Sequence, residues 1–470
     1  MFSQLSQVVV VGGGLAGLST ARYLSILLPS LSIIIVEKQP KLGGNSQKAS
    51  SGINSVNTVH QETCSIFDSP SAFFNDTILS GRGYCQQKLV ETLVEQSTDA
   101  FHWIEAETQL DLSKIVQCGG HSQPRTHSPV NAKGNIGYEL ISRISAKLNS
   151  AQNVKVLYNT RCTNIEIEND KVKGIEIESA DFNGSIPAQA VILATGGYAF
   201  NVKDILGERV QESTQLSKVH KLYERIGKQM PTTNGCTSTG DALSWASNIN
   251  AKILDLEHVQ VHPTGFVDPN DTTNPIKILA PEALRAAGGI LISPLTGKRF
   301  VDELTTRDKV TEAIVDQVES LEYPYVYLVL TKDMVEKYGM KSIGFYEFKK
   351  LIQRLDFKTA VLALHSEPGY LKDLGFDGDL WVAKVTPAIH YTMGGIAINE
   401  KAQVLSNNGG VITGLYAAGE VSAGVHGGNR LAGNSLLECV VFGRLAAQNV
   451  ASENLFDASE LRQGNCRVSS

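Results

Sequence analysis

The sequence lacks three kinds of pattern, and each absence excludes a class of protein. Its seven cysteines are scattered and form no CxxC or CxxCH pair, which argues against zinc ribbons, iron–sulfur clusters and c-type haem. The net charge is −6 and Lys/Arg-rich runs are missing, so a nucleic-acid-binding face is not expected. No apolar run approaches the ~20 residues that cross a bilayer. We therefore expect reduced, mostly buried thiols, no metal site, and neither a nucleic-acid nor a membrane partner.

The two ends of the chain carry the strongest patterns. The start, MFSQLSQVVVV, leads almost directly into a strand and leaves no room for a signal peptide, which predicts a cytoplasmic location. Glycine-rich signatures cluster near both ends, whereas the middle has more helix-like patterning, as in Asp308–Glu319. The pattern predicts a discontinuous cofactor domain, residues 1–257 and 386–470, with a second domain, residues 258–385, inserted between its parts.

The first glycine-rich signature follows an all-apolar run. Val8–Val11 is β-branched throughout, as expected for a strand buried on both faces of a parallel sheet. It leads into GGGLAG, Gly12–Gly17, which contains GxGxxG and is followed by apolar residues at helical spacing. Such a turn lets a pyrophosphate approach the backbone, and the helix N-terminus favours its negative charge.

A carboxylate stands at the distance that this signature requires. Ser32–Lys38 is predicted to form a second strand ending on Glu37, 20 residues after Gly17. That carboxylate can accept hydrogen bonds from ribose hydroxyls, and it argues against a 2′-phosphorylated ligand. The combination predicts dinucleotide binding.

Two later segments favour FAD over NAD. VILATGGYAF (Val191–Phe200) and GLYAAGEV (Gly414–Val421) each have the pattern of a strand followed by glycine, and the second contains an acid, Glu420. Contacts from both ends of the chain suit a ligand that is stretched through the protein. Ordinary joints between strands and helices are the alternative explanation of each segment.

Several further motifs resemble one known family. In chain order they are GGNSQKASSGIN (Gly43–Asn54), GGHSQPRTH (Gly119–His127), TNGCTSTGDA (Thr233–Ala242), QVHPTGF (Gln260–Phe266), ELTTRD (Glu303–Asp308), HYTMGG (His390–Gly395) and GGNRLAGNSLLECVVFGR (Gly427–Arg444). Together they resemble the soluble FAD-dependent fumarate reductases of fungal type, within the succinate dehydrogenase/fumarate reductase flavoprotein family. The resemblance implies an α/β fold: a discontinuous Rossmann-like FAD-binding domain with an inserted α+β capping domain that closes over a small dicarboxylate.

The resemblance also bears on how the flavin is held. In membrane-bound relatives a histidine bonds covalently to the flavin within the segment that matches Gly43–Asn54. Here no histidine occurs between Met1 and Val59, and asparagine and serine occupy that place. We therefore expect non-covalent FAD, which favours fumarate reduction over succinate oxidation.

The FAD contacts that the resemblance implies come from both ends of the chain. They are Gly12, Gly14, Ala16, Gly17, Glu37, Lys38, Gly44, Asn45, Ser46, Ser51, Gly52, Ala194, Thr195, Gly196, Asp241, Glu420, Ser435 and Leu436. Backbone amides at Ser435 and Leu436 are expected near the flavin C2 carbonyl, where a helix N-terminus stabilises charge on the reduced ring.

The resemblance likewise implies roles at the substrate. Arg430 binds one carboxylate as a fork, and His390 and His262 donate hydrogen bonds that polarise the diacid. Flavin N5 supplies hydride and Arg307 supplies the proton. Glu282 and Arg285 relay protons to Arg307 from solvent.

An arginine is an unusual acid, because guanidinium is normally charged permanently. Thr305 or Thr306 is predicted to cap a helix, which places Arg307 in its first turn, where the helix dipole disfavours a cation by only ~0.3–1 kcal/mol. We expect repulsion from Arg285 to add to this effect and Glu282 to oppose it. The histidines and arginine of GGHSQPRTH are expected to pack or shape the site rather than react.

Two departures from the family pattern concern the substrate. Pro281 stands where relatives often have a threonine that binds substrate, and proline offers no side-chain donor. Residues 342–381 resemble the family least, so closure of the capping domain is expected to differ there.

The leading prediction is a soluble fumarate reductase that forms succinate. The alternatives are another flavin-dependent reductase of unsaturated acids and an L-aspartate oxidase. Ketosteroid dehydrogenases share the fold and glycine signatures, but cationic side chains that bind carboxylates would serve them poorly. A flavin-binding protein without turnover is the alternative from another class. Reduced free flavin or a flavin reductase is the expected electron donor, and the sequence does not indicate an oligomeric state.

Overall fold

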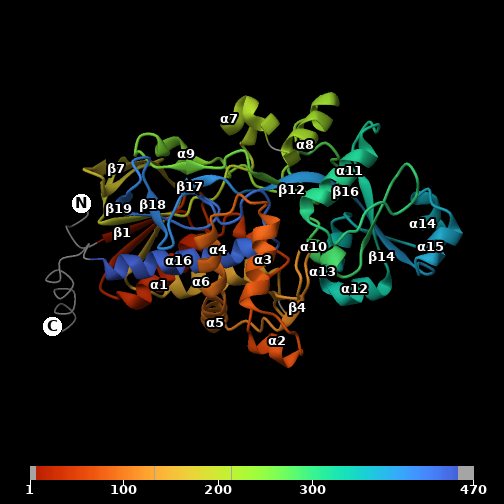
Figure 1. Cartoon of the computed structure of the whole chain (residues 1–470), viewed down its shortest axis with the longest axis horizontal. Helices are drawn as coiled ribbons and strands as arrows, with labels where there is room; N and C mark the ends of the chain where they lie inside the picture. The colour runs from red at the N-terminus through yellow and green to blue at the C-terminus, as the bar shows by residue number, and fades with distance from the viewer. Residues whose placement is uncertain (1–6, 132, 213, 454–470) are drawn as a thin grey trace.

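The computed structural model describes residues 7–131, 133–212 and 214–453. Two parts lie side by side along the longest axis of the molecule (Figure 1). One part contains the largest sheet and both ends of the described chain, and the other contains the five-stranded sheet. The predicted absence of a signal peptide concerns residues 1–6, which lie outside the described residues.

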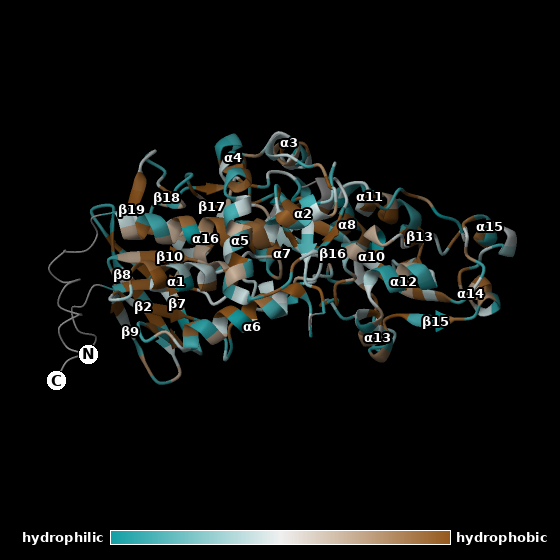
Figure 2. Ribbon diagram, turned by 90° about the horizontal axis from the view of Figure 1, so that it is seen from below, coloured by the Kyte–Doolittle hydropathy of each residue, from teal (hydrophilic) through white to brown (hydrophobic). Residues whose placement is uncertain are grey.

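The apolar run near the start forms β1 (Gln7–Val11), which is buried along its whole length. It pairs in parallel with β2 (Ser32–Val36) and β10 (Ala190–Leu193), as predicted for a strand covered on both faces. Strand β10 pairs in parallel with β19 (Val411–Ala417), so segments from both ends of the chain share this sheet. Figure 2 shows its central strands mostly in the brown of hydrophobic residues.

The nine strands of this sheet run in the order β6-β2-β1-β10-β19-β8-β7, with β18 beside β19 and β9 beside β8. The remaining strands are β6 (Val154–Leu157), β7 (Thr160–Glu168), β8 (Lys171–Ser179), β9 (Asn183–Pro187) and β18 (Gln403–Leu405). Small sheets in the same part join β3 (Ile53–Asn54), β5 (Thr126–Ser128) and β4 (Lys114–Val116), and β11 (Ile253–Leu254), β17 (Gly395–Ala397) and β20 (Ser422–Ala423).

Helices from both ends of the chain cover the large sheet. The first helix, α1 (Leu15–Leu27), lies beside the last, α16 (Asn434–Ser452) (Figure 1). The others of this part are η1 (Ser46–Lys48), α2 (Val59–Thr63), α3 (Pro70–Ser80), α4 (Gln87–Glu95), α5 (Ser97–Thr108), α6 (Ile136–Asn149) and α9 (Asp241–Ala246).

The second part is built on an antiparallel sheet in the order β12-β16-β14-β13, with β15 also paired to β16. Its strands are β12 (Val259–Phe266), β13 (Ile290–Ile292), β14 (Val326–Leu330), β15 (Gln353–Leu355) and β16 (Leu380–Thr392). Its helices are α7 (Val202–Leu206), η2 (Gly207–Glu212), α8 (Thr214–Arg225), α10 (Glu282–Ala286), α11 (Arg307–Val318), α12 (Lys332–Tyr338), α13 (Met340–Phe348), α14 (Phe357–Ala363) and α15 (Pro368–Asp373).

The predicted α/β class is confirmed, with a Rossmann-like start and a second α+β part. Helix α8 packs against α11 and β12, so residues before 258 also contribute to the core of the second part. The exact boundaries of the two domains stay a prediction. No described helix is both long enough and apolar enough to cross a bilayer.

The cysteines agree with the sequence only in part. All six cysteines within the described residues are unpaired, but only Cys118, Cys162 and Cys439 are buried. The expectation that most thiols are buried is therefore not met, and Cys466 lies outside the described residues.

Candidate active site

The glycine-rich turn after β1 brings α1 close to the sheet. Gly12 has φ +109°, and a Cβ there would lie 2.2 Å from the carbonyl oxygen of Ala194. A Cβ on Gly17 would lie 2.0 Å from the carbonyl oxygen of Gly12. These two glycines permit close packing, whereas an ideal Cβ on Gly14, the N-cap of α1, would make only an ordinary van der Waals contact, 3.6 Å from Ser46 Oγ.

The acid at the end of β2 is oriented by backbone amides. Glu37 accepts hydrogen bonds from Gly13 N and Gln39 N, each at 2.8 Å. The next residue, Lys38, pairs with Asp241 across 3.0 Å. The carboxylate of Glu37 is thus fixed beside the glycine turn, as ribose recognition requires.

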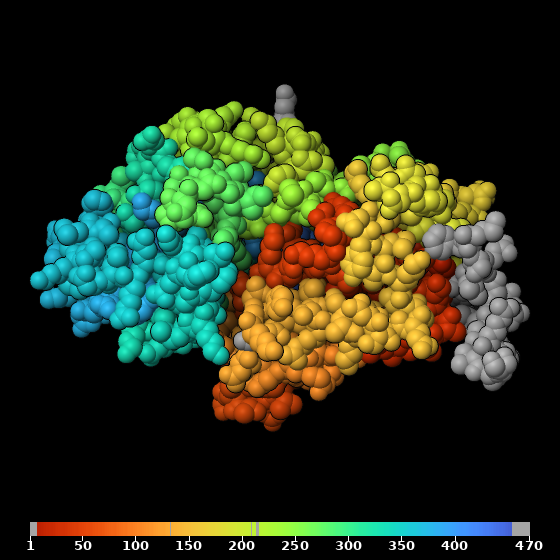
Figure 3. Space-filling view, turned by 180° about the vertical axis from the view of Figure 1, so that it is seen from behind, coloured from red at the N-terminus to blue at the C-terminus, as the bar shows by residue number. Residues whose placement is uncertain are grey.

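One cavity of about 550 Å³ extends from the N-terminus of α1 to the predicted substrate residues. Every predicted FAD residue except Gly17 lines it: Gly12, Gly14, Ala16, Glu37, Lys38, Gly44, Asn45, Ser46, Ser51, Gly52, Ala194, Thr195, Gly196, Asp241, Glu420, Ser435 and Leu436. Arg307, His390 and Arg430 line the same cavity. It lies where the two parts meet, which Figure 3 shows from behind, with green and cyan atoms on one side and red to yellow atoms on the other.

The cavity fits a non-covalently held dinucleotide. Gly196 has φ +75° and no other atom within 4 Å of an ideal Cβ, so its backbone is open to a ligand. At the far end α16 begins after Gly433, with no acidic residue in its first turn. The amides of Ser435 and Leu436 belong to that turn, where backbone donors lack helical partners and favour negative charge. Burial raises the pKa of Glu420, which also lines the cavity, to about 7.

Arg307 is held by two side chains of the second part. It is the first residue of α11 and follows the N-cap Thr306, as predicted, although the threonine side chain makes no capping hydrogen bond. Arg307 donates from Nε to Glu282 Oε2 (2.6 Å) and from Nη1 to Gln260 Oε1 (2.8 Å). The side chain is only 7% exposed, so both contacts are made almost without solvent.

Glu282 stands between two arginines. Its Oε2 lies 3.6 Å from Arg285 Nη2, and its Oε1 accepts from Gly119 N (2.6 Å). Although burial opposes ionisation, the charges of Arg307 and Arg285 lower the pKa of Glu282 to about 2. Burial, reinforced by repulsion from Arg307, lowers the pKa of Arg285. The three groups form a contiguous chain along which a proton can move.

Two histidines lie next to each other on the paired strands β12 and β16. The rings of His262 and His390 are 5.1 Å apart. Burial and the charge of Arg307 lower the pKa of each well below its usual value, so both rings are neutral. His262 Nδ1 lies 3.2 Å from both the amide nitrogen and the carbonyl oxygen of Thr264, which hold the ring in place. Thr233 Oγ1 lies 2.7 Å from His390 Nδ1 and fixes that ring.

Arg430 is buried and, among the described residues, forms no ion pair. The residue is 2% exposed; its Nη1 donates to the carbonyl oxygen of Leu431 (3.2 Å), and its Nε has no hydrogen-bond partner within the described chain. Its guanidinium lies 4.5 Å from the centre of the Tyr391 ring. Burial and repulsion from Arg307 lower the pKa of Arg430 well below its usual value. An anion entering the cavity would satisfy this guanidinium.

The structure brings some predicted residues to the cavity and places others behind it. His262, Glu282 and Arg285 do not line the cavity; the histidine lies behind His390, and the other two lie behind Arg307. Pro281 is the N-cap of α10 and makes no side-chain capping bond.

Sequence reasoning missed two residues that hold the site together. Gln260 Nε2 donates to the carbonyl oxygen of Arg430 (2.7 Å), while its Oε1 accepts from Arg307. Thr233, noted above, orients His390. Both residues lie in motifs that the sequence showed, but their roles depend on contacts between distant strands and loops.

The motif GGHSQPRTH packs away from the cavity. Arg125 is fully buried and pairs with Asp68 and Asp76 at 2.9 and 2.5 Å. His121 contacts the carbonyl oxygen of Ala432 at 3.0 Å, and His127 contacts Thr58. These contacts support the loop after Arg430 from behind and agree with a structural role.

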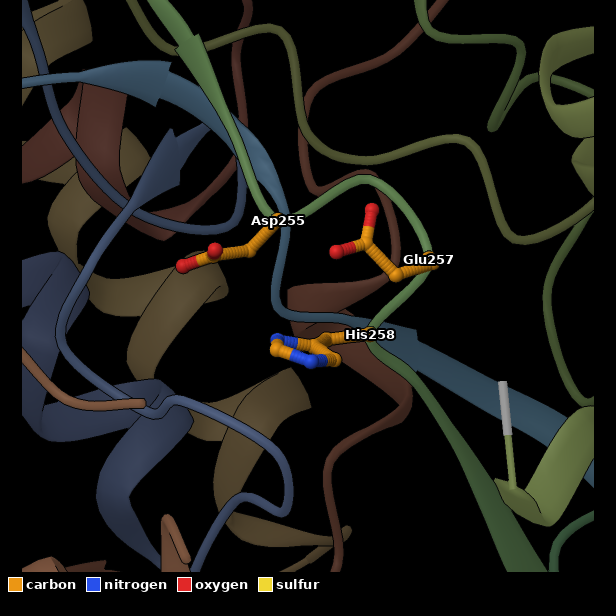
Figure 4. A group of neighbouring side chains, drawn as sticks. All are labelled: Asp255, Glu257 and His258. Atoms are coloured by element: carbon orange, nitrogen blue, oxygen red, sulfur yellow. The ribbon is translucent and has the colours of Figure 1, made fainter. Parts of the chain in front are cut away.

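Three possible metal ligands lie on the turn between β11 and β12, outside the cavity. Asp255, Glu257 and His258 each offer one ligand atom, all within 4.8 Å of one another (Figure 4). All three side chains are partly exposed, and such acidic turns are common without an ion. These contacts alone do not indicate a function for the turn.

Comparisons with known proteins agree with this geometry. Residues 7–436 match the model of the FAD binding domain family. The chain is 39% identical to Fumarate reductase 1 of Saccharomyces cerevisiae, over 96% of this chain and 99% of the relative. It is 36% identical to Fumarate reductase of Schizosaccharomyces pombe, over 96% of this chain and 90% of the relative.

A solved structure gives the same picture in three dimensions. The open conformation of a flavocytochrome c3 fumarate reductase matches 96% of this chain and 78% of that chain, with 30% identity and a TM-score of 0.73. The glycine turn, the cavity and the two arginines thus occur in a chain that matches two fungal fumarate reductases over at least 90% of their length. The chain belongs to the FAD-binding flavoprotein family of the fumarate reductases.

Proposed function

We propose that this protein is an FAD-dependent fumarate reductase that converts fumarate to succinate. One observation carries the proposal: two buried arginines, Arg307 and Arg430, face one cavity whose other end has the features of a dinucleotide site. The names of the fungal relatives point to the same reaction.

The substrate would be held through its carboxylates. Arg430 has no ion-pair partner among the described residues, and its fork of donors matches a carboxylate. His390, fixed by Thr233, adds a neutral donor, and His262 packs against its ring; a direct hydrogen bond from His262 to the substrate stays a prediction from the sequence. Hydrogen bonds to the carboxylate withdraw charge from the alkene and make it a better hydride acceptor.

Reduction requires a hydride at one alkene carbon and a proton at the other. Reduced FAD, when bound, supplies the hydride. Arg307 donates the proton to the resulting carbanion-like carbon, which completes succinate. A proton then moves from Arg285 to the Glu282 carboxylate and on to the neutral guanidine of Arg307, 2.6 Å from Glu282, and solvent restores the proton of Arg285.

The finer assignments are part of the same proposal. We expect reduced free flavin or a flavin reductase to supply electrons, and a cytoplasmic location stays a prediction. Related unsaturated acids and iminoaspartate are the alternatives that the sequence left open.

An anaerobic assay tests the reaction directly. The purified protein, loaded with FAD and reduced, is mixed with fumarate, maleate, mesaconate or iminoaspartate, and flavin reoxidation is followed. We expect fumarate to reoxidise the flavin fastest, with succinate as product. Faster reoxidation by another acid would reassign the substrate, and a flavin inert to all four would reject the function.

A further inference from the structure

The loop between α3 and α4, residues 81–86, supports the segment that carries Arg430. Gly81 O accepts from Gly428 N (2.8 Å). Ser80, which ends α3, donates from Oγ to the carbonyl oxygen of Asn429 (2.8 Å). Ser80 and Gly81 therefore hold the backbone at Gly428 and Asn429, the two residues before Arg430.

The same loop reaches the helix that carries Arg307. Arg82 forms an ion pair with Asp308, the residue after Arg307 in the first turn of α11. Asp308 is fully buried, and within the described part of the chain its carboxylate oxygens have no hydrogen-bond partner. Its counter-charge thus comes from the opposite part of the molecule, and a buried carboxylate that loses its partner is strongly unfavourable.

The backbone conformation at position 82 favours glycine, so an arginine at this position points to a role for its side chain. Arg82 has φ +56°, in the left-handed region where residues other than glycine are uncommon, and it stands between Gly81 and Gly83. Two positions further on, the Tyr84 ring packs 4.4 Å from the ring of His258, on the turn shown in Figure 4. The loop therefore contacts the second part at two places.

We propose that Arg82 is a positioning residue for Arg307, an inference that rests on the proposed function. Its ion pair with Asp308 anchors the first turn of α11 against the loop that also supports Arg430. The two arginines are thereby held in one geometry although they belong to different parts. Without Arg82 the first turn of α11 shifts and the proton donor leaves its place, while the carboxylate site on Arg430 is kept.

Steady-state kinetics of FAD-loaded variants test this role. Arg82→Met is expected to lower kcat about 30-fold and to change KM less than about threefold, because misplacement by about 1 Å costs on this order. Arg82→Gly, which relieves the backbone but removes the charge, should be equally impaired, and Arg82→Lys should recover most of kcat. Arg82→Met combined with Asp308→Asn should stay impaired, since the anchoring ion pair is absent although no buried charge is left unpaired.

Two controls separate this role from general damage. Arg143→Met removes an arginine of similar exposure, 42%, whose partner Glu139 is 6% exposed, and should leave both constants unchanged. Ser80→Ala weakens the support of the Arg430 segment and should raise KM severalfold with kcat kept. Normal kcat in Arg82→Met, or a double variant with restored kcat, would overturn the proposal.

Hydrogen exchange gives a readout that does not depend on activity. In FAD-loaded Arg82→Met the amides of Val310 and Thr311 should exchange at least about tenfold faster than in the wild type, whereas amides of α16 should not change. Unchanged exchange in α11 would contradict the proposal. If the wild type fails to reduce fumarate, the proposed function is rejected. The exchange rates would still test whether Arg82 anchors α11.

Discussion

The two arginines of the cavity differ in how their charges are compensated. Arg307 donates to Glu282 and Gln260 and is joined through Glu282 to Arg285. Arg430 faces the ring of Tyr391 and has no ion-pair partner among the described residues. One cation is thus part of a row of paired charges, whereas the other is buried without an ion pair within the described chain.

This difference indicates a division of labour. A cation whose charge is already paired gains little from binding a carboxylate but can exchange a proton with its partner. A buried cation without a partner gains the most from an anionic ligand. We therefore expect substitutions around Arg307 to affect turnover and substitutions of Arg430 to affect binding.

The largest effect is expected for Arg307→Lys. An ammonium cannot contact Glu282 and Gln260 at once, and general acid catalysis contributes about 10²–10⁴-fold, so kcat should fall about 10³-fold. Rapid-quench or steady-state assays with fumarate measure it. Turnover near that of the wild type would assign the proton to another group.

Glu282→Gln should lower kcat about 100-fold by interrupting the relay while Arg307 stays in place. The amide keeps the shape of the carboxylate but cannot carry a proton between the two arginines. The KM for fumarate is expected to stay within about threefold. A larger change of KM than of kcat would show that Glu282 binds substrate instead.

Arg430→Lys is expected to act mainly on binding. Loss of the bidentate fork costs about 2 kcal/mol, which corresponds to a KM about 30-fold higher. The dissociation constant of succinate, measured by perturbation of the flavin spectrum, should rise by a similar factor. A fall in kcat with unchanged affinity would break the proposed division between the two arginines.

The last prediction concerns stability and pH and not activity. Burial raises the pKa of Glu420 from 4.5 to about 7, so the folded protein favours its neutral form. The stability that the folded protein gains from protonated Glu420 is complete below about pH 4.5 and is lost as pH rises through about 7. Between these values the flavin-free wild type should lose up to about 3 kcal/mol of unfolding free energy relative to Glu420→Gln. A difference in unfolding free energy between the wild type and Glu420→Gln that stays constant at all pH values would contradict this prediction.

The flavin-binding part could be predicted closely from the sequence. The strand Val8–Val11, the glycine turn and the acid Glu37 each have local signals, and β1, α1 and β2 form where those signals place them. All predicted FAD contacts but Gly17 line the cavity, since a turn with a fixed backbone leaves few alternatives.

The second part and the supports of the site could not be predicted in the same way. Residues 342–381 form α13, β15, α14 and α15, whose short lengths give weak periodicity. Arg82 acts through Asp308, and Gln260 acts through Arg307 and Arg430, at least 47 positions away in the sequence, and no local pattern specifies such pairs. The family resemblance indicated most of the residues that line the cavity, but not the order in which they contact each other.

The central claim is that Arg430 grips the diacid while Arg307 is reserved for the proton. A crystal structure of the FAD-loaded protein with succinate tests it most directly. We predict one carboxylate bound bidentately by Arg430, with the guanidinium of Arg307 next to a methylene carbon and still paired with Glu282. A structure in which Arg307 binds a carboxylate, or in which succinate lies away from both arginines, would contradict the account.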